Sequence, residues 1–322
     1  MGGYSSSLDF CKLVMALLVV GIHTEPFGFN IWLDRGFGIV TRLCVPFFFV
    51  CSSYLYFSQK DADKLEKAKR YVLRIFTLYL LWSIVYLPFD IEKLAHIDFL
   101  SLLDRFLWSG NDHALWYLCG SIVGFLILFF LKKIIKSEKV IMVIAFLLLL
   151  VGCLKSTWAP LTESIIKREV VDLWGSRNGL FYAFPYYSLG MIIAHEKEQP
   201  NLRKLILGFS ISMLLLIVES IVFVVVFHTD ATILWISVLP LSYFFFKIVR
   251  SIQLPDKCKQ IAKFCRNMST VVYTSHHLFL YLFSDMKYVP YFLVVSICSL
   301  ATAFVVVYLS RKRLFNWLKY SY

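Results

Sequence analysis

Residues 7–25 read SLDFCKLVMALLVVGIHTE, an apolar stretch that is long enough to cross a bilayer as one helix. Asp9, Lys12 and His23 nevertheless lie inside this stretch or near its ends. A Lys or Asp at the centre of a membrane span costs roughly 2.5 to 3.5 kcal/mol on insertion scales, so such residues point to function. Lys12 and His23 are eleven positions apart, which places them on one helix face about 16 Å apart along its axis. The stretch therefore predicts a membrane-spanning helix with a polar stripe along one side.

The composition extends this prediction to the whole chain. Of its 322 residues, 59% are hydrophobic and 17% are charged, whereas a soluble domain has about 25% charged residues. Apolar runs recur along the chain, so we predict an all-α polytopic membrane protein with about ten transmembrane helices around a polar central cavity. We interpret 1–322 as a single integral membrane domain with no fused soluble domain. The spans are expected at 8–27, 36–58, 71–88, 114–131, 140–154, 178–195, 205–227, 231–250, 269–286 and 289–310.

The basic residues predict how the chain is oriented. The net charge is +12, and Lys and Arg concentrate in every second loop and in the C-terminal tail. By the positive-inside rule these segments face the cytoplasm. We therefore expect a multi-pass protein of the cell membrane with both termini in the cytoplasm. Because topology explains the basic character, we expect the lipid bilayer as a partner and no nucleic acid.

The cysteines and a histidine pair give little support for a metal site. The eight cysteines contain no CxxC pair, and most lie in apolar runs, where Cys behaves as a small hydrophobic residue. His276 and His277 are adjacent on an expected helix, so their side chains point about 100° apart and chelate a metal poorly without further ligands. We therefore expect neither a disulfide framework nor a bound metal.

The second expected span carries an arginine followed by a proline. Arg42 precedes the run Val45-Pro46-Phe47-Phe48-Phe49. Pro46 removes a backbone donor and predicts a kink, and a kinked helix suits the wall of a cavity. Arg42 would lie about 9 Å below the outer start of its helix, at a depth comparable to that of His23. The alternative interpretation is an arginine whose guanidinium extends to the lipid headgroups.

The first inner loop, 59–70, is rich in lysine and leads into two arginines. Arg70 and Arg74 are one helical turn apart and share a face. They form the expected phosphate-binding cluster for a nucleotide-bearing ligand that arrives from the cytoplasm. Topological anchoring explains the loop lysines equally well, but it accounts less well for Arg74, which is four residues into the span.

Two outer segments carry polar and aromatic residues where helices begin. His113 and Trp116 open the fourth span and are candidates for the rim of an outward-facing site, although Trp also belongs to interfacial aromatic belts. Arg177 and Asn178 stand at the outer end of the sixth span. They are candidates to bind a polar ligand at the outer face, and helix capping is the alternative.

Two later spans also carry polar candidates. Glu219 lies in one of the most apolar stretches, where a carboxylate should be protonated or paired. It is a candidate to orient His23 or another cavity residue, and a structural hydrogen bond between helices is the alternative. The ninth span contains Tyr273 and His276 in a Tyr-x-x-His pattern.

These motifs, in this order, resemble the membrane-bound acyltransferase family 3. That family opens with Arg, ten residues and then His, where this chain has Lys12 and His23. Its Val-Pro-Phe-Phe-Phe run is similar to 45–49, and its late Tyr-x-x-His matches Tyr273 and His276. Lys12 keeps the charge of the arginine but loses its bidentate fork.

Three further positions refine the resemblance. Residues 113–118 are similar to the family's His-Leu-Trp-Phe/Tyr-Leu element, and Ser53 stands where the family has Gly. The stretch Arg177-Asn178-Gly179-Leu180-Phe181 resembles members close to the membrane half of the vancomycin-resistance serine racemases. The resemblance covers nearly the whole chain.

The resemblance implies a membrane acyltransferase that takes an acetyl or other acyl group from cytoplasmic acyl-CoA, usually acetyl-CoA. The group would pass to a hydroxyl or amine of an extracytoplasmic acceptor, such as a cell-envelope glycan or a small polar molecule. The expected donor-binding residues are Asp9, Lys12, Arg70 and Arg74. The expected acceptor-binding residues are His113, Trp116, Arg177, Asn178, Tyr273 and His276.

The expected catalytic residues are His23, Arg42 and Glu219. His23 would act as general base or carry the acyl group, because imidazole suits both roles near neutral pH. Arg42 would stabilise the developing oxyanion in a dry cavity. Either Glu25, which is nearest in sequence, or Glu219 would orient His23.

A transporter is the alternative function. The serine racemase relatives suggest uptake of an amino acid such as serine, and buried ionisable residues with a proline-kinked helix serve transport as well as catalysis. The chain lacks the inverted repeat that many transporters have. An inactive membrane scaffold, the third option, would leave Lys12, His23, Arg42 and His276 unexplained.

Overall fold

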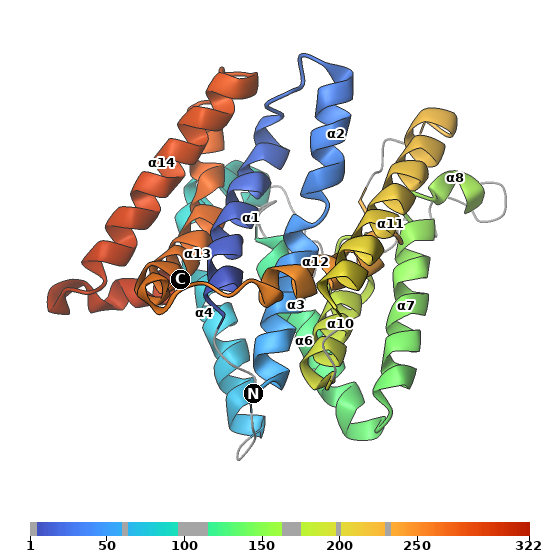
Figure 1. Cartoon of the computed structure of the whole chain (residues 1–322). Coiled ribbons are helices and arrows are strands. Elements are labelled where there is room, and N and C mark those ends of the chain that lie inside the picture. Colours follow the sequence, from blue (N-terminus) through green and yellow to red (C-terminus); the bar gives the residue numbers. More distant parts are fainter. Residues whose placement is uncertain (1–4, 60–63, 96–114, 163–174, 198–200, 229–232) are drawn as a thin grey trace. The chain divides into compact units, whose positions relative to one another are not determined.

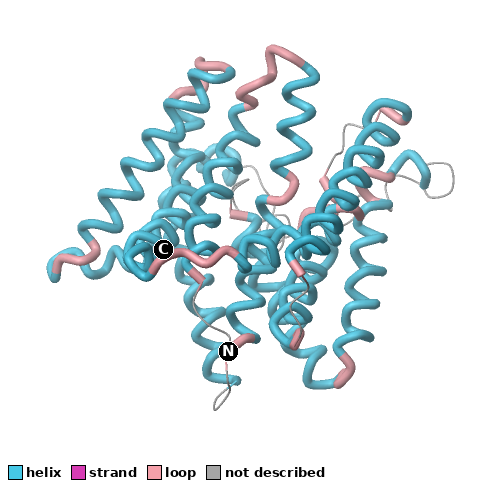
Figure 2. Tube along the Cα trace, in the orientation of Figure 1, coloured by secondary structure: helices cyan, strands magenta, loops and turns pink. Residues whose placement is uncertain are grey.

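The structure is a computed structural model that describes residues 5–59, 64–95, 115–162, 175–197, 201–228 and 233–322. Every regular element in these ranges is a helix (Figure 2). The chain divides into two compact units, and each is described by itself. The terminal unit consists of Gly3–Val45, Phe76–His96 and Val249–Tyr322. The middle unit consists mainly of Pro46–Ile75 and Ile97–Ile248.

In the terminal unit, helices from the N-terminal part of the sequence pack against helices from the C-terminal part. Helix α1 packs along α13, and α14 packs against both (Figure 1). The second half of α4 belongs to the same unit. Its elements are α1 (Ser6–Thr24), α2 (Ile31–Thr41), part of α4 (Lys64–Ala95), η4 (Asp256–Cys258), α13 (Lys259–Leu282), α14 (Tyr288–Leu309) and η5 (Arg313–Ser321).

The end of α1 is a defined turn that places His23 in the last helical turn. Glu25 adopts a left-handed conformation with φ 44°, and its backbone N–H donates to the Gly21 carbonyl. Such a residue is a common helix terminator. Asn30 then starts α2 by accepting hydrogen bonds from the backbone N–H groups of Trp32 and Leu33.

The expected second span is two helices, α2 and α3 (Cys44–Phe57), separated at Arg42 and Leu43. We predicted a kink from Pro46, and the interruption falls just upstream of that residue. The reason is steric, because a proline ring clashes with the carbonyl of the residue four positions earlier, here Arg42. Helix α2 also begins at Ile31, five residues before the predicted start of the span.

The middle unit is built from helices that approach one another closely. A Cβ atom on Gly190 would lie 2.5 Å from the Val50 carbonyl oxygen, so α10 needs glycine where it meets α3. Ser53 donates to the Tyr187 carbonyl at 2.5 Å, a role that a glycine there could not take. The elements are α3, the first half of α4, α6 (Trp116–Ile134), α7 (Glu138–Leu154), α8 (Ala159–Thr162), η2 (Gly179–Ala183), α10 (Phe184–His195), α11 (Leu202–Ser220), η3 (Ile221–Val226) and α12 (Val238–Ser251).

Six stretches of the described chain are long and apolar enough to cross a membrane. They are Ser6–Thr24, Ile31–Phe57, Lys64–Phe89, Trp116–Ile134, Leu202–Val226 and Tyr288–Leu309. The other four predicted spans also contain helix, but α7, α10 and α12 are shorter than 18 residues, and the first half of α13 is polar. The all-helical prediction is therefore confirmed for the described residues, whereas ten spans and a central cavity stay predictions.

Candidate functional site

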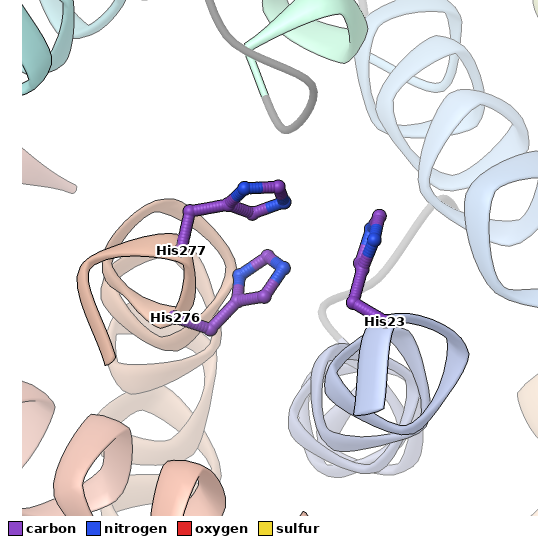
Figure 3. Close-up of side chains that lie close together, drawn as sticks. All are labelled: His23, His276 and His277. Atoms are coloured by element: carbon purple, nitrogen blue, oxygen red, sulfur yellow. The ribbon is translucent and has the colours of Figure 1, made fainter. Parts of the chain in front are cut away.

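Three histidines meet in the terminal unit (Figure 3). His23 comes from the last turn of α1, and His276 and His277 come from α13. The ring centroid of His23 lies 5.3 Å from that of His276 and 4.7 Å from that of His277. The centroids of the two α13 rings are 4.6 Å apart. One ring nitrogen from each residue lies within 4.8 Å of the others. The predicted base thus adjoins the histidine of the Tyr-x-x-His motif.

The packing of α1 along α13 creates this cluster. Consecutive residues on a helix leave it in directions about 100° apart, yet the rings of His276 and His277 lie side by side toward His23 in Figure 3. His276 is fully buried and His277 is 5% exposed, while His23 is half-buried. The cluster is therefore enclosed on the α13 side and more open at His23.

The hydrogen bond of His276 defines its protonation pattern. Its Nδ1 atom lies 2.6 Å from the Tyr273 carbonyl oxygen, which can only accept. Nδ1 therefore carries the hydrogen, and Nε2 of the neutral ring keeps its lone pair. Nε2 is buried, and no described residue gives it a hydrogen bond. The cluster thus contains an imidazole nitrogen whose lone pair is held at a fixed place.

Helix α4 supports α13 at the level of the cluster. The Tyr86 hydroxyl donates to the Thr274 carbonyl at 2.5 Å, and the Phe89 ring stacks on Tyr281 at 5.1 Å. Tyr86 itself is fully buried. These contacts fix the segment of α13 that carries both histidines.

A charged group lies near the start of α1. The Lys12 ammonium donates to the Asp9 carboxylate at 3.2 Å, and both side chains are largely buried. Arg266, from α13, approaches the other oxygen of Asp9 at 3.7 Å. The structure therefore brings together two predicted donor-binding residues and adds a second cation. One carboxylate between two cations leaves one positive charge in excess.

Arg42 is the half-buried residue that ends α2. Because α2 starts earlier than predicted, Arg42 follows a complete helix of 11 residues and lies deeper along it than the 9 Å predicted.

Arg70 and Arg74 are exposed on the first half of α4, in the middle unit, and Arg70 donates to the Glu66 carbonyl. A donor site that joins these arginines to Lys12 stays a prediction.

Glu219 forms a closed hydrogen-bond network within the middle unit. Its carboxylate accepts from the Trp158 indole at 2.9 Å and from the backbone N–H groups of Ile236 at 3.1 Å and Ser237 at 3.0 Å. The Ser237 hydroxyl also donates to it. These bonds tie α11 to the turn before α12 and match the structural interpretation. With four donors in place, little acceptor capacity remains to orient a histidine.

Trp116 and Arg177 form an aromatic and cationic platform in the middle unit. The Trp116 ring stacks on Tyr182 at 5.5 Å, and the guanidinium of Arg177 lies 5.6 Å from the Trp116 ring centre. Arg177 is exposed. These two predicted acceptor-binding residues are therefore brought together.

Asn178 has the capping role that we had kept as the alternative. Its side-chain oxygen accepts from the N–H groups of Leu180 and Phe181, both at 2.9 Å, and its amide donates to the Gly175 carbonyl. The residue is 1% exposed, so its polar atoms are used internally and direct contact with an acceptor is not expected. His113 lies outside the described residues.

The sequence matches the acyltransferase domain family known as acyltransferase 3 over residues 5–311. The chain belongs to this family. The resemblance in the motifs is confirmed, and the family together with the apolar helices identifies a membrane protein.

Three relatives of this acyltransferase 3 chain are racemases from enterococci. An amino-acid racemase of Enterococcus faecalis is 27% identical over 212 residues, which cover 61% of this chain and 28% of that protein. A serine/alanine racemase of Enterococcus gallinarum is 26% identical over 231 residues, covering 67% and 33%. Another amino-acid racemase of E. faecalis is 25% identical over 335 residues, covering 96% and 47%. The chain thus spans less than half the length of each, and no solved structure matches it.

The acyltransferase 3 chain also contains site residues that the motifs did not identify. His277 was considered with His276 as a metal-binding pair and set aside, and its proximity to His23 depends on the packing of α1 and α13. Arg266 precedes the predicted ninth span, in a basic stretch that topology already explained, and nothing in the sequence connects it to Asp9. Tyr86 is one of many aromatic residues in an apolar run and carries no signal of its own.

Proposed function

We propose that the chain is a membrane acyltransferase that moves an acetyl or longer acyl group from cytoplasmic acyl-CoA to a hydroxyl or amine of an extracytoplasmic acceptor, such as a cell-envelope glycan. The observation that carries this proposal is the contact between His23 and His276 in a chain of the acyltransferase 3 family. The chain would cross the membrane several times with both termini in the cytoplasm, as its basic loops predict.

His23 is the proposed general base. It would take the proton of the acceptor as the acceptor oxygen or nitrogen attacks the thioester carbonyl. The carbon–sulfur bond then breaks, and the CoA thiolate leaves with the proton that His23 returns. His23 could also carry the acyl group itself as an acyl-imidazole. In either case Arg42 is the proposed stabiliser of the oxyanion.

His276 is the proposed positioning residue for His23. A histidine that works through one ring nitrogen needs its other N–H held by an acceptor. The buried Nε2 of His276, which receives no hydrogen bond from any described residue, would serve as such an acceptor, and the Tyr273 carbonyl holds the ring in that tautomer. The imidazole of His276 would therefore orient His23, a role for which the sequence predicted a carboxylate.

The charged group at the start of α1 is the proposed donor end. Lys12 and Arg266 provide two cations around one carboxylate, and a phosphate of acyl-CoA would compete with Asp9 for them. Arg70 and Arg74, on the middle-unit half of α4, are proposed as further donor-binding residues. About 16 Å of helix separates Lys12 from His23, a gap that the extended pantetheine arm of CoA would bridge.

The platform of Trp116 and Arg177 is the proposed acceptor-binding surface of the middle unit, and His113 and Tyr273 are each proposed to contact the acceptor as well. A stacked aromatic pair with an exposed guanidinium suits the apolar face and the hydroxyl groups of a sugar. It equally suits a small polar acceptor.

A second candidate function, uptake of an amino acid such as serine, rests on a different observation. The relatives carry the names amino-acid racemase and serine/alanine racemase, and this chain covers only part of each. A membrane segment in such a protein would import an amino acid substrate.

Acetyl-CoA turnover by the purified protein in liposomes separates the two functions. We expect turnover to be lost in His23→Ala, and the KM for acetyl-CoA to rise about tenfold in Lys12→Ala with partial recovery in Lys12→Arg. His195→Ala, in the middle unit, is the matched control. The acyltransferase proposal would be overturned if the wild type neither bound nor turned over acyl-CoA. Uptake of labelled serine would then test transport.

A further inference from the structure

We infer that His23, His276 and His277 form a binding site for a divalent transition metal, with Zn²⁺ as the ion that fits best. The inference requires no acyl transfer, because it concerns binding alone. It revises the reason for expecting no metal, which was that two adjacent histidines lack further ligands. His23 of α1 supplies the third ligand (Figure 3).

The distances are close to those of a metal site. One nitrogen of each histidine lies within 4.8 Å of the others. Zinc bonds to histidine of about 2.0–2.1 Å in a tetrahedron would place these nitrogens about 3.3 Å apart. Metal binding would draw the three nitrogens closer together, and His23 is the half-buried member of the cluster.

The tautomer of His276 is the one that a metal ligand requires. Histidines that bind metals through one nitrogen usually donate their other N–H to a carboxylate or a backbone carbonyl. Nδ1 of His276 donates to the Tyr273 carbonyl at 2.6 Å, and its fully buried Nε2 has no hydrogen-bond partner among the described residues. The lone pair of Nε2 is therefore available toward the centre of the cluster.

The ligand set selects the class of ion. In the part of the chain that the structure describes, the potential metal ligands of this cluster are three imidazoles. Imidazole suits Zn, Cu, Fe and Ni, whereas Mg²⁺ and Ca²⁺ need oxygen ligands. Zn²⁺ is favoured because three histidines with one open position is a known zinc arrangement. The open position would take water or a substrate oxygen at the side of His23.

Metal binding would also regulate the proposed reaction, a consequence that rests on the proposed function. A ring nitrogen of His23 that is bonded to zinc has no lone pair left to accept a proton. Bound Zn²⁺ would then inhibit acyl transfer, and a chelator would restore it. The binding measurement below gives its answer even if the chain transfers no acyl group.

The test uses the full chain in detergent, without a polyhistidine tag and after removal of metals with a chelator. Zn²⁺ is titrated calorimetrically, and Co²⁺ is added as a spectroscopic probe because its visible absorption reports tetrahedral nitrogen coordination. We expect one Zn²⁺ per chain. We also expect affinity to fall on the order of 100-fold in His277→Ala, since even changes behind the ligands cost 10–100-fold.

Two further variants keep the test clear of folding effects. His277→Cys replaces one zinc ligand by another and should restore binding, with a Co²⁺ spectrum shifted by the thiolate. His195→Ala removes an exposed histidine of the middle unit that pairs with Glu138, and it should bind Zn²⁺ as the wild type does. Absence of saturable Zn²⁺ binding, or equal binding in wild type and His277→Ala, would overturn the inference and leave a cluster of packed imidazole rings.

Discussion

The histidine cluster of the terminal unit and the carboxylates of the middle unit differ in what surrounds them. In the middle unit, Glu219 accepts four hydrogen bonds, and Glu196 accepts from Tyr243 and from the buried ammonium of Lys247. In the terminal unit, the fully buried His276 keeps a ring nitrogen without a hydrogen bond from any described residue. A buried ionisable group is therefore a weak guide to function until its partners are known.

This difference has an energetic basis. A buried carboxylate that receives several donors is stabilised where it stands and holds helices together. A buried nitrogen with an unused lone pair has given up its hydration without compensation. Proteins keep such atoms where a ligand, a proton or a metal uses them. We therefore assign chemistry to the terminal unit and a supporting role to the paired carboxylates of the middle unit.

The largest expected effect comes from the histidine cluster. His23→Ala should lower kcat by about 10²–10⁴, the usual contribution of a general base, with little change in the KM for acyl-CoA. Turnover is measured at saturating acyl-CoA, with the thermal unfolding of the variant as a check on its fold. If His23→Ala kept the kcat of the wild type, the contrast between the two units would lose its functional meaning.

Glu219 should affect stability instead. Glu219→Ala leaves the donors of Trp158, Ile236 and Ser237 without their acceptor, so we expect a loss of about 2–4 kcal/mol in the free energy of unfolding. Glu219→Gln keeps one acceptor oxygen and should lose less. Thermal unfolding in detergent measures both. A stable Glu219→Gln protein with a reduced kcat would contradict the structural role and restore the catalytic one.

These two residues also show how far sequence reasoning reached. The polar stripe from Lys12 to His23 was predictable because helical spacing fixes the face on which a residue lies. The partners of Glu219 were not, because its donors come from a turn and from a segment 61 residues away in the chain. Sequence periodicity describes one helix, whereas a hydrogen-bond network depends on how several helices pack.

The same limit explains the other results for fold and site. Apolar runs identified the helices, but the end of α2 depended on the clash between Pro46 and the carbonyl four residues earlier. The cluster required α1 and α13 to pack together, although more than 200 residues separate them in sequence. His277 therefore became part of the site only when His23 stood beside it.

Tyr86 offers a smaller test within the terminal unit. Tyr86→Phe removes the hydrogen bond to the Thr274 carbonyl next to the histidines, and we expect a loss of about 1 kcal/mol in stability. Tyr320→Phe, at a tyrosine of the same unit that is 65% exposed, is the matched control and should be neutral. Thermal unfolding compares the two. Equal midpoints would show that α4 does not hold α13 through this bond.

The smallest effect concerns Glu138, an ionisable residue of the middle unit that is paired near its surface. Partial burial raises the pKa of this carboxyl, but the hydrogen bond from Lys132 and the charge of His195 outweigh burial, so the pKa lies below its ordinary value of 4.5. A depressed folded-state pKa means that the ion pair adds stability above the unfolded-state pKa and loses it as pH falls through the folded-state value.

We therefore expect the thermal unfolding midpoint of the wild type to decrease as the pH is lowered below about 4.5, and to decrease by more than the midpoint of Glu138→Gln. The difference between the two proteins should shrink at high salt. The pair of Lys259 with the exposed Asp256 provides a comparison at a more open site. The difference in midpoint between the wild type and Asp256→Asn should change less with pH than the difference between the wild type and Glu138→Gln, because solvent screens an exposed pair. If Glu138→Gln followed the wild type across this pH range, Glu138 would add nothing to folding, and the pairing of carboxylates in the middle unit would be geometric without being stabilising.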